Sequence, residues 1–425
     1  MSVVLRSAPL LPAVGTWVRR SINARKFRFE AANAPSRRQL LVDVSVIISG
    51  DAGTGIQRVV RALLGELTKL SRDDLLVQPV FATRNHGYCR ARFDKDGTIA
   101  KLSREEGLLH PVSVRGGDIF LGLDLAAHLI PHLERDLERW RRQGVSLNFL
   151  VYDVLPVLRP DWFPANTPSN IDRWLHVLAR QADRCICISE TVLADLADAL
   201  RLRSSRSIPA LATIPLGWDL RASYPSRGLP ENVQAIRTWL RHYSAVLSVG
   251  TVEPRKGYVQ LLEAMTYHWD RNPDSTTGLI VIGRRGWKTD GLQDRLRTHP
   301  EHGKRLLWLD EATDELLAEI YPDAAGLVAA SHGEGFGLPL IEAHAHGLPV
   351  LARDLPVFRE IGGERFDYFD DDSPHALSER LGSWLSRPKR PPTDIADELP
   401  RWSDSAQALA ACIGVTQYLP DGAQP

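Results

Sequence analysis

The sequence predicts an α/β protein made of two facing domains, each a parallel sheet covered by helices. Its 425 residues are too many for a single hydrophobic core. Short apolar stretches alternate with helical stretches, which is the pattern of parallel sheets with helices on both faces. This alternation stops in a proline- and glycine-containing segment, residues 220–230, and then starts again. The chain should therefore fold as two similar halves joined by a linker.

The first half opens with a dense apolar run that predicts a buried strand over residues 41–48. A glycine turn follows at residues 51–55, and apolar residues at helical spacing predict a helix over 56–67. The remaining elements expected in this half are strands at 118–123, 146–152, 185–189 and 212–216, and helices at 126–142 and 168–182.

The second half repeats the alternation. Helices are expected at 231–242, 257–269, 314–321 and 339–346, and strands at 245–249, 278–282, 306–309, 326–329 and 350–352. A final helix, around residues 400–412, is expected to pack back on the first domain. These elements divide the chain into a basic arm (1–38), a first domain (39–222), a second domain (223–395), and a C-terminal helix and tail (396–425). In such folds ligands bind between the carboxyl ends of the two sheets.

Composition gives no overall bias toward nucleic acid or membrane, because the formal net charge is zero. The arm at residues 1–38 differs, with eight basic residues against one acid, Glu30. Pro9 and the Arg19-Arg20 pair argue against a signal peptide. We expect a cytoplasmic protein whose arm is either disordered or an anchor on anionic lipid; in the second case the protein would be peripheral on the inner face of the cytoplasmic membrane. The four cysteines are expected to be reduced core residues.

The most informative string runs from Ser331 to Pro349 and carries two carboxylates, Glu334 and Glu342. Between them, Gly335 and Gly337 flank Phe336, and glycine lets the backbone approach a ligand closely. Leu338 and Pro339 follow, and proline suits the first turn of a helix. A helix N-terminus attracts anions through its free N–H groups. The string therefore suits a sugar linked to a phosphate.

Other candidates follow predicted strands. Arg255 and Lys256 come after the strand 245–249 and could neutralise a diphosphate, although an exposed charged loop is the simpler reading. Asp153 follows the strand 146–152 and is either a cleft residue or a turn cap. A further phosphate-binding turn is possible at Gly53, Thr54 and Gly55.

A metal site is not expected. Glu342, His344 and His346 do not form the His-Glu-x-x-His arrangement, and residues 370–372, three aspartates, read better as a capping loop. No Gly-x-Ser-x-Gly nucleophile motif occurs.

Taken together, residues 40–375 resemble the retaining glycosyltransferases of family 4, whose GT-B fold has two facing Rossmann-like domains. The string 331–349 resembles the family's E-x7-E motif, and 253–257 its basic diphosphate element. Residues 213–217 resemble the strand before the interdomain crossover. Asp43-Val44-Ser45 together with 54–58 resembles a subgroup that assembles bacterial surface polysaccharides, often mannosyl- or rhamnosyltransferases.

The resemblance implies a role for each site residue. Glu334 would hold hydroxyls of the donor sugar, and Glu342 the nucleotide ribose. Arg255 and Lys256 would grip the diphosphate, while Gly55 would let the first domain close over it. One departure concerns Asp153, because many relatives have His-Asp where this chain has Tyr-Asp at 152–153.

The resemblance also implies an activity. The chain would move a hexose, with mannose or rhamnose favoured, from a nucleotide-diphosphate sugar such as GDP-mannose to a glycan or lipid-linked acceptor. No cofactor, metal or nucleic acid would take part. The alternatives are an epimerase or phosphorylase of the same fold, or an inactive scaffold that binds nucleotide sugars within a polysaccharide assembly complex.

Overall fold

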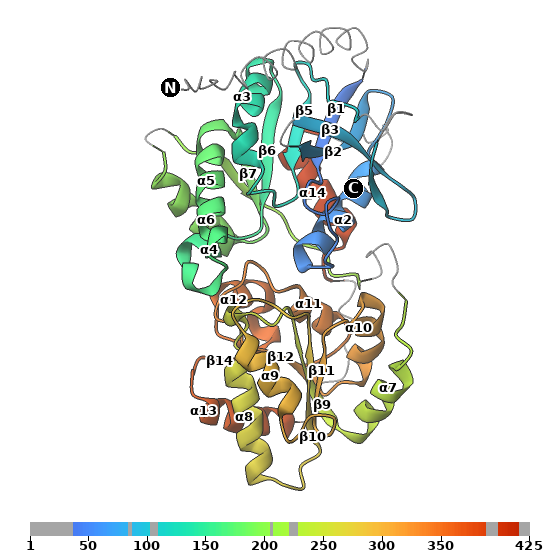
Figure 1. Ribbon diagram of the computed structural model, residues 1–425, viewed down its shortest axis with the longest axis vertical. Helices are drawn as coiled ribbons and strands as arrows, with labels where there is room; N and C mark the ends of the chain where they lie inside the picture. The colour runs from blue at the N-terminus through green and yellow to red at the C-terminus, as the bar shows by residue number, and fades with distance from the viewer. Residues whose placement is uncertain are drawn as a thin grey trace, which may run out of the picture.

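The computed structural model describes residues 37–83, 87–102, 109–204, 207–220, 228–387 and 398–415. Nearly all of the expected basic arm, residues 1–36, lies outside these ranges, as do residues 221–227 of the expected linker. The described chain forms two α/β units, one above the other in Figure 1. The predicted fold class, two facing Rossmann-like domains with mainly parallel sheets, is confirmed.

The first domain is built on an eight-stranded sheet with the order β4-β3-β2-β1-β5-β6-β7-β8. Among the described strands of this sheet, β3 runs antiparallel to β2 and to β4, and the other pairs are parallel. Its strands are β1 (Arg38–Asp43), β2 (Leu75–Thr83), β3 (Gly87–Phe93), β4 (Ile99–Lys101), β5 (Ile119–Gly122), β6 (Ser146–Val151), β7 (Arg184–Cys187) and β8 (Ala210–Thr213). Its helices are α2 (Gly55–Thr68), α3 (Glu134–Arg142), α4 (Leu155–Leu158), α5 (Asn166–Gln181) and α6 (Glu190–Arg201), with short 3-10 turns η2 (Ile130–Leu133) and η3 (Pro160–Trp162).

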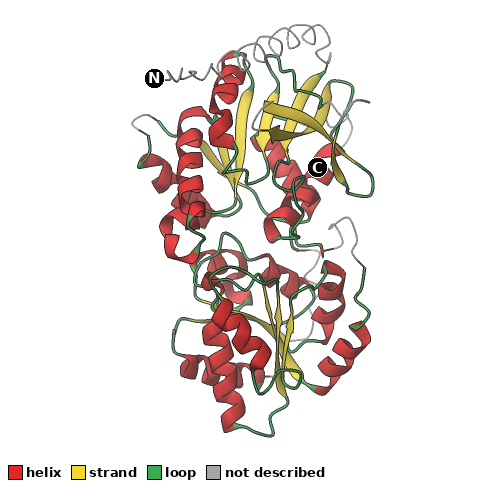
Figure 2. Ribbon diagram, viewed as in Figure 1, coloured by secondary structure: helices red, strands yellow, loops and turns green. Residues whose placement is uncertain are grey.

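The second domain has a six-stranded, fully parallel sheet with the order β11-β10-β9-β12-β13-β14, covered by helices as Figure 2 shows. Its strands are β9 (Ser244–Val249), β10 (Thr277–Ile282), β11 (Leu306–Leu309), β12 (Gly326–Ala329), β13 (Val350–Arg353) and β14 (Asp367–Phe369). Its helices are α7 (Val233–His242), α8 (Tyr258–Arg271), α9 (Asp290–Thr298), α10 (Asp314–Ile320), α11 (Leu338–Ala345), α12 (Pro356–Gly362) and α13 (Pro374–Leu385), with the 3-10 turns η5 (Pro254–Lys256), η6 (Tyr321–Asp323) and η7 (Gly363–Arg365).

The last described helix, α14 (Trp402–Cys412), returns to the first domain and packs against α2 (Figure 1). Trp402 and Leu409 are buried in the first domain's hydrophobic core, and the Trp402 indole donates to the carbonyl of Asp219 at 3.0 Å. Gly217 lies so close to Trp402 that a Cβ would stand 2.5 Å from its backbone nitrogen. The C-terminal helix is therefore part of the first domain's core.

Several predicted elements differ from the structure. The strand expected over 41–48 ends at Asp43, because the chain turns where Asp124 accepts hydrogen bonds from the N–H groups of Val46 and Ile47, both at 2.8 Å. The helix expected from 126 begins as the turn η2, with a proline in its first positions, and becomes α-helical only at Glu134.

Two further differences concern strands. The strand expected over 212–216 is β8 (Ala210–Thr213), displaced toward the N-terminus, since Pro215 has no N–H to donate. The strand expected at 350–352 is β13 (Val350–Arg353), and one strand that was not expected, β14 (Asp367–Phe369), follows it and pairs with it. Strands β2 to β4 and helices α4, α6, α9 and α12 were absent from the sequence prediction.

Candidate functional site

The candidate site lies at the carboxyl ends of β9 and β12, which are neighbours in the second domain's sheet. The chain continues from β9 to β10 on one side, while β12 and β13 lie on the other. Such a switch point leaves a crevice between the loops that follow the two strands, and ligands of open α/β sheets bind there. The loops here are residues 250–257 and 330–337.

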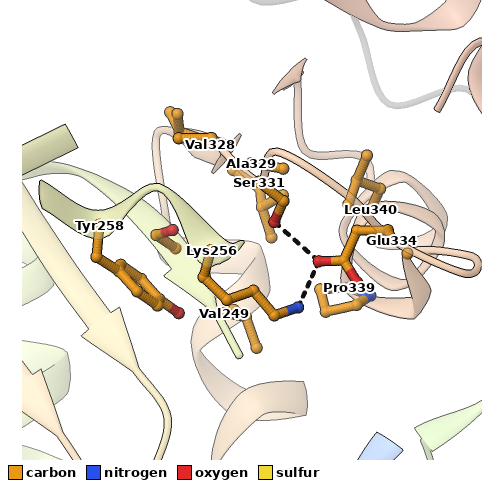
Figure 3. A pocket seen from close by; sticks show the side chains of 13 residues that line it. Val249, Lys256, Tyr258, Val328, Ala329, Ser331, Glu334, Pro339 and Leu340 are labelled. Atoms are coloured by element: carbon orange, nitrogen blue, oxygen red, sulfur yellow. Dashed lines mark hydrogen bonds and ion pairs between the residues drawn. The ribbon is translucent and has the colours of Figure 1, made fainter. Parts of the chain in front are cut away.

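Glu334 is the centre of the site, and three side chains contact its carboxylate. Figure 3 shows two of them, Lys256 and Ser331. Lys256 Nζ lies 2.5 Å from Oε1, and Ser331 Oγ donates to the same oxygen at 2.8 Å. The guanidinium of Arg255 pairs with the other oxygen, Oε2. The Glu334 side chain is only 10% exposed, so these charges meet in a largely buried place.

Arg255 is held in place from three directions. It lies in the turn η5 directly after Glu253, whose carboxylate is 2.9 Å from Arg255 Nε. Its Nη1 also donates to the carbonyl of Gly333 at 2.8 Å, and its own carbonyl accepts from His332 N at 2.7 Å. The loops after β9 and β12 are therefore tied together through one arginine.

Gly257 allows these two loops to approach each other. Its φ of +68° lies in the left-handed region, and a Cβ on this residue would stand 2.0 Å from the carbonyl oxygen of Ala330. The residue after Arg255-Lys256 therefore has to be glycine for the turn to dock against the end of β12.

The charge of Glu334 is fixed by these contacts. Burial alone would raise its pKa, but Arg255 and Lys256 outweigh burial and hold the pKa at about 2. The carboxylate is thus anionic at neutral pH. Burial raises the pKa of Glu253, with Arg255 acting in the opposite direction.

Asp153 joins this cluster from the first domain, where it follows β6. Its carboxylate accepts from Leu155 N at 3.1 Å, and burial raises its pKa against the field of Arg255. Gly335 packs directly on this segment, since a Cβ there would lie 2.0 Å from the carbonyl oxygen of Tyr152 and 3.2 Å from Asp153 Cβ. The hydroxyl of Ser189, at the start of α6, donates to the Gly335 carbonyl at 2.8 Å. The two domains therefore touch beside Glu334.

The Tyr152 side chain does not take part in this cluster. It is buried in the first domain, and its hydroxyl donates to the carbonyl of Leu123 at 2.7 Å. At this position the chain thus has a core residue.

Glu342 lies on α11 and is 1% exposed. Its carboxylate pairs with Arg58 of α2 through Oε1 and accepts from the Tyr321 hydroxyl at 3.2 Å through Oε2. Burial raises the pKa of Glu342, and Arg58 opposes this shift. The two glutamates of the string 331–349 thus lie in separate ion clusters, and Glu342 belongs to the contact between α2 and α11.

The glycine turn lies at the start of α2. Thr54 caps this helix in a capping box with Gln57, and Gly53 has a left-handed φ of +61°. A Cβ on Gly55 would be 3.9 Å from the Leu338 side chain, so this turn faces the start of α11. Leu338 is buried in the first domain's core, and Phe336 packs against the cores of both domains.

The structure therefore brings Glu334, Arg255, Lys256 and Asp153 together and places Glu342 beside the glycine turn. Sequence reasoning missed three residues of the site, namely Arg58, Ser331 and Tyr321. Arg58 and Ser331 belong to the motifs 54–58 and 331–349, and their places in these motifs could have marked them as site residues. Nothing in the sequence pointed to Tyr321.

In the part of the chain that the structure describes, no three His, Cys, Asp or Glu side chains are grouped so that they could hold a metal ion. Asp372, of the aspartate run 370–372, instead pairs with Arg353 at 2.6 Å. None of the helices in the described ranges has the length and apolar character that a membrane crossing requires.

Comparison with known proteins bears on these observations. The serotype-specific mannosyltransferase WbdA of Escherichia coli is 38% identical over 353 residues, which are 82% of this chain and 43% of that protein. The chain spans 41% to 43% of the length of the three WbdA sequences it matches. The O-antigen chain mannosyltransferase B of E. coli is 26% identical over 54% of this chain and 58% of its own length.

Solved structures resemble the whole described fold. HepE of Anabaena, in complex with UDP and glucose, superposes with a TM-score of 0.55 and 14% sequence identity. The superposition covers 89% of this chain and 95% of the HepE chain. At this identity the likeness shows the fold alone. The family model of the glycosyl transferases group 1 matches residues 239–397, which include both loops of the candidate site. The part of the chain that carries the candidate site is therefore similar in sequence to the glycosyl transferases group 1.

Proposed function

We propose that the chain is a retaining glycosyltransferase that moves a hexose from a nucleotide-diphosphate sugar to a glycan or lipid-linked oligosaccharide. The observation that carries the proposal is the convergence of Arg255 and Lys256 on Glu334 at the switch point of the second domain, with Asp153 of the first domain beside them. Two adjacent cations at a strand end fit a diphosphate, and the anionic carboxylate fits sugar hydroxyls.

The names of the relatives favour mannose as the sugar and O-antigen polysaccharide as the product. GDP-mannose is therefore the donor that we propose to test first. The acceptor would be the growing glycan, carried on a lipid.

The proposed mechanism is a front-face displacement. The bond between the anomeric carbon and the diphosphate oxygen breaks, and the acceptor oxygen forms its bond on the same face of the sugar. The proton of the acceptor hydroxyl passes to the departing diphosphate, whose charge Arg255 and Lys256 neutralise. Glu334 is not the nucleophile in this scheme, because both of its oxygens are already paired with these cations. Two side-chain cations supply the positive charge, so the scheme requires no metal ion.

Asp153 would contact the reacting sugar from the first domain, while Gly335, Phe336, Gly337 and Leu338 would present backbone N–H groups to the donor. Gly53, Thr54 and Gly55 would lie over its diphosphate. Glu342 would bind the ribose. These roles follow the resemblance to family 4, and the positions of the residues are compatible with them.

The test is turnover with a panel of GDP-, UDP- and dTDP-sugars and a mannoside acceptor, with the anomeric configuration of the product read by NMR. We expect release of one nucleoside diphosphate and a product that retains the donor's configuration. Inversion of configuration, or no turnover with any donor of the panel, would contradict the proposal.

A second candidate is an inactive scaffold that binds nucleotide sugars. The observation that favours it is Tyr152, whose hydroxyl is used inside the first domain where many family 4 relatives have a histidine. Calorimetric binding of a nucleotide sugar without turnover would support the scaffold. An epimerase, in contrast, would alter the donor when no acceptor is present.

We further propose that the chain divides into a basic arm at 1–38, domains at 39–222 and 223–395, and a C-terminal segment at 396–425. The arm would bind the anionic inner face of the cytoplasmic membrane, with each basic residue contributing on the order of 1 kcal/mol. Deleting residues 1–36 should then reduce sedimentation with phosphatidylglycerol vesicles but not with phosphatidylcholine vesicles. Equal sedimentation of the full chain and the deletion variant with phosphatidylglycerol vesicles would refute the anchor.

A further inference from the structure

Arg58 of the first domain reaches into the second domain and contacts two carboxylates there. Its Nη2 lies 2.5 Å from Asp314 Oδ1 on α10, and its Nη1 pairs with Glu342 Oε1 on α11. The Arg58 side chain is 13% exposed and that of Glu342 only 1%. This guanidinium thus joins three helices from two domains in a nearly buried place.

The Glu342 carboxylate keeps acceptor capacity in this arrangement. An ionised carboxylate has about four lone-pair sites. Arg58 uses one on Oε1, and the Tyr321 hydroxyl uses one on Oε2 at 3.2 Å. Each oxygen can therefore accept one more hydrogen bond, which matches the two hydroxyls of a ribose.

The position of Arg58 on α2 links it to the glycine turn. Arg58 is three residues beyond Gly55, whose Cβ position is 3.9 Å from the Leu338 side chain at the start of α11. The first turn of α2 therefore brings both the glycine turn and Arg58 onto α11. The contact between α2 and α11 therefore includes the ion pair that holds the Glu342 carboxylate.

Resting on the proposed function, in which Glu342 binds the donor ribose, we propose that Arg58 is a positioning residue for the nucleotide end of the donor. It fixes the direction of the Glu342 carboxylate so that the remaining lone pairs face the ribose hydroxyls. A buried carboxylate without this cation would turn or take up a proton, and the ribose would lose its acceptor.

The test compares a nucleoside diphosphate with inorganic pyrophosphate, because only the former has a ribose. Calorimetry would measure the binding of GDP, UDP, dTDP and pyrophosphate to wild-type protein, Arg58→Met and Arg58→Lys. We expect Arg58→Met to bind the preferred nucleoside diphosphate about 10-fold more weakly, as for the loss of a hydrogen bond to a charged group, with unchanged pyrophosphate binding. Arg58→Lys keeps the charge but loses the forked guanidinium, so its affinity for the nucleoside diphosphate should lie between those of wild type and Arg58→Met.

Glu360→Gln is the matched control. Glu360 also joins the domains, since its carboxylate accepts from Glu190 N at 2.6 Å and Thr191 N at 3.0 Å, but it belongs to the contact between α12 and α6. This variant should bind the nucleoside diphosphate as wild type does. A circular dichroism melt of each variant would separate loss of binding from loss of fold, and Arg58→Lys keeps the test valid if Arg58→Met does not fold.

Three outcomes would overturn the inference. They are unchanged nucleoside diphosphate binding in both Arg58 variants, equal weakening of nucleoside diphosphate and pyrophosphate, and tighter binding in Arg58→Met, which would make Arg58 an obstruction. Wild-type protein that binds pyrophosphate but none of the three nucleoside diphosphates would instead refute the proposed function, and the inference with it.

Discussion

Glu334 is the residue on which the charge arrangement of the site depends, because Arg255 and Lys256 share its carboxylate. Removing one partner of a buried ion pair leaves an uncompensated charge, which is far more costly than removing an exposed pair. The pair of cations therefore needs an anion at this position. In the proposed reaction the donor diphosphate would supply a second one.

Glu334→Gln should lower the free energy of unfolding by about 3 kcal/mol, since it leaves two largely buried cations with a neutral partner. Urea denaturation at pH 7 would measure the change. Glu319→Gln is a suitable control, because Glu319 pairs with Arg237 at an exposed position and should matter by less than about 0.5 kcal/mol. Equal stability of wild type and Glu334→Gln would show that the cluster is not a buried ion network.

The same residue predicts a pH dependence. The pKa of Glu334 falls from 4.5 to about 2 on folding, so its stabilising contribution is present above pH 4.5 and is lost as the pH falls toward 2. The difference in unfolding free energy between wild type and Glu334→Gln should shrink across this range. A difference that stays constant between pH 5 and pH 2.5 would contradict the assigned ionisation.

At the scale of elements, the loop between β12 and α11 packs closely against the first domain. Gly335 packs against the backbone of Tyr152 with no room for a side chain, and Phe336 contacts both cores. The loop that carries Glu334 is thus held by the first domain as well as by its own.

Gly335→Ala should separate the Tyr152 segment from this loop, because its Cβ would otherwise stand 2.0 Å from a carbonyl oxygen. We expect transfer to fall by about 10²-fold, as when a mutation misplaces reacting groups by about 1 Å. Gly382→Ala in α13, where a Cβ meets nothing within 4 Å, is the control and should be as active as wild type and slightly more stable. Full activity of Gly335→Ala would mean that the observed domain contact is not needed for transfer.

Elements with local signals were the predictable ones. β11 (Leu306–Leu309) and β12 (Gly326–Ala329) have the bounds expected from sequence, because short apolar runs between turns define them locally. The predicted end of β1 was wrong because Asp124, which lies 78 residues from Val46 and 77 from Ile47, turns the chain there. No pattern within a window of sequence contains such a contact.

The same distinction applies to the site. Arg255 and Glu334 could be expected to meet, since both follow strands whose carboxyl ends lie at one edge of a sheet. The pairing of Arg58 with Glu342 could not, because it joins residues 284 positions apart and depends on how two domains meet. Hence the sequence predicted the cluster of Arg255 and Glu334 more completely than the pair of Arg58 and Glu342.

At the scale of the whole molecule, the chain crosses between the domains twice, because α14 returns to the first domain after the second is complete (Figure 1). Buried residues of α14, including Trp402 and Leu409, complete the first domain's core. The first domain is therefore built from both ends of the described chain, and its stability depends on residues beyond position 400.

Leu409→Ala should cost about 3 kcal/mol of unfolding free energy, because it removes a fully buried side chain and leaves a cavity. Leu202→Ala is the matched control, since Leu202 is 85% exposed and its truncation should change stability by less than about 0.5 kcal/mol. Thermal or urea unfolding would compare the two variants. Equal stability of the two would show that α14 does not contribute to the core.

The central claim is that Arg255 and Lys256 neutralise a departing diphosphate beside Glu334. Steady-state turnover of Lys256→Ala with the preferred nucleotide sugar tests it most directly, with exposed Lys304→Ala as the control for loss of a lysine. We predict that kcat falls by about 10²- to 10³-fold in Lys256→Ala, with an unchanged circular dichroism spectrum, and is unchanged in Lys304→Ala. A Lys256→Ala enzyme that turns over at the wild-type rate would contradict the account.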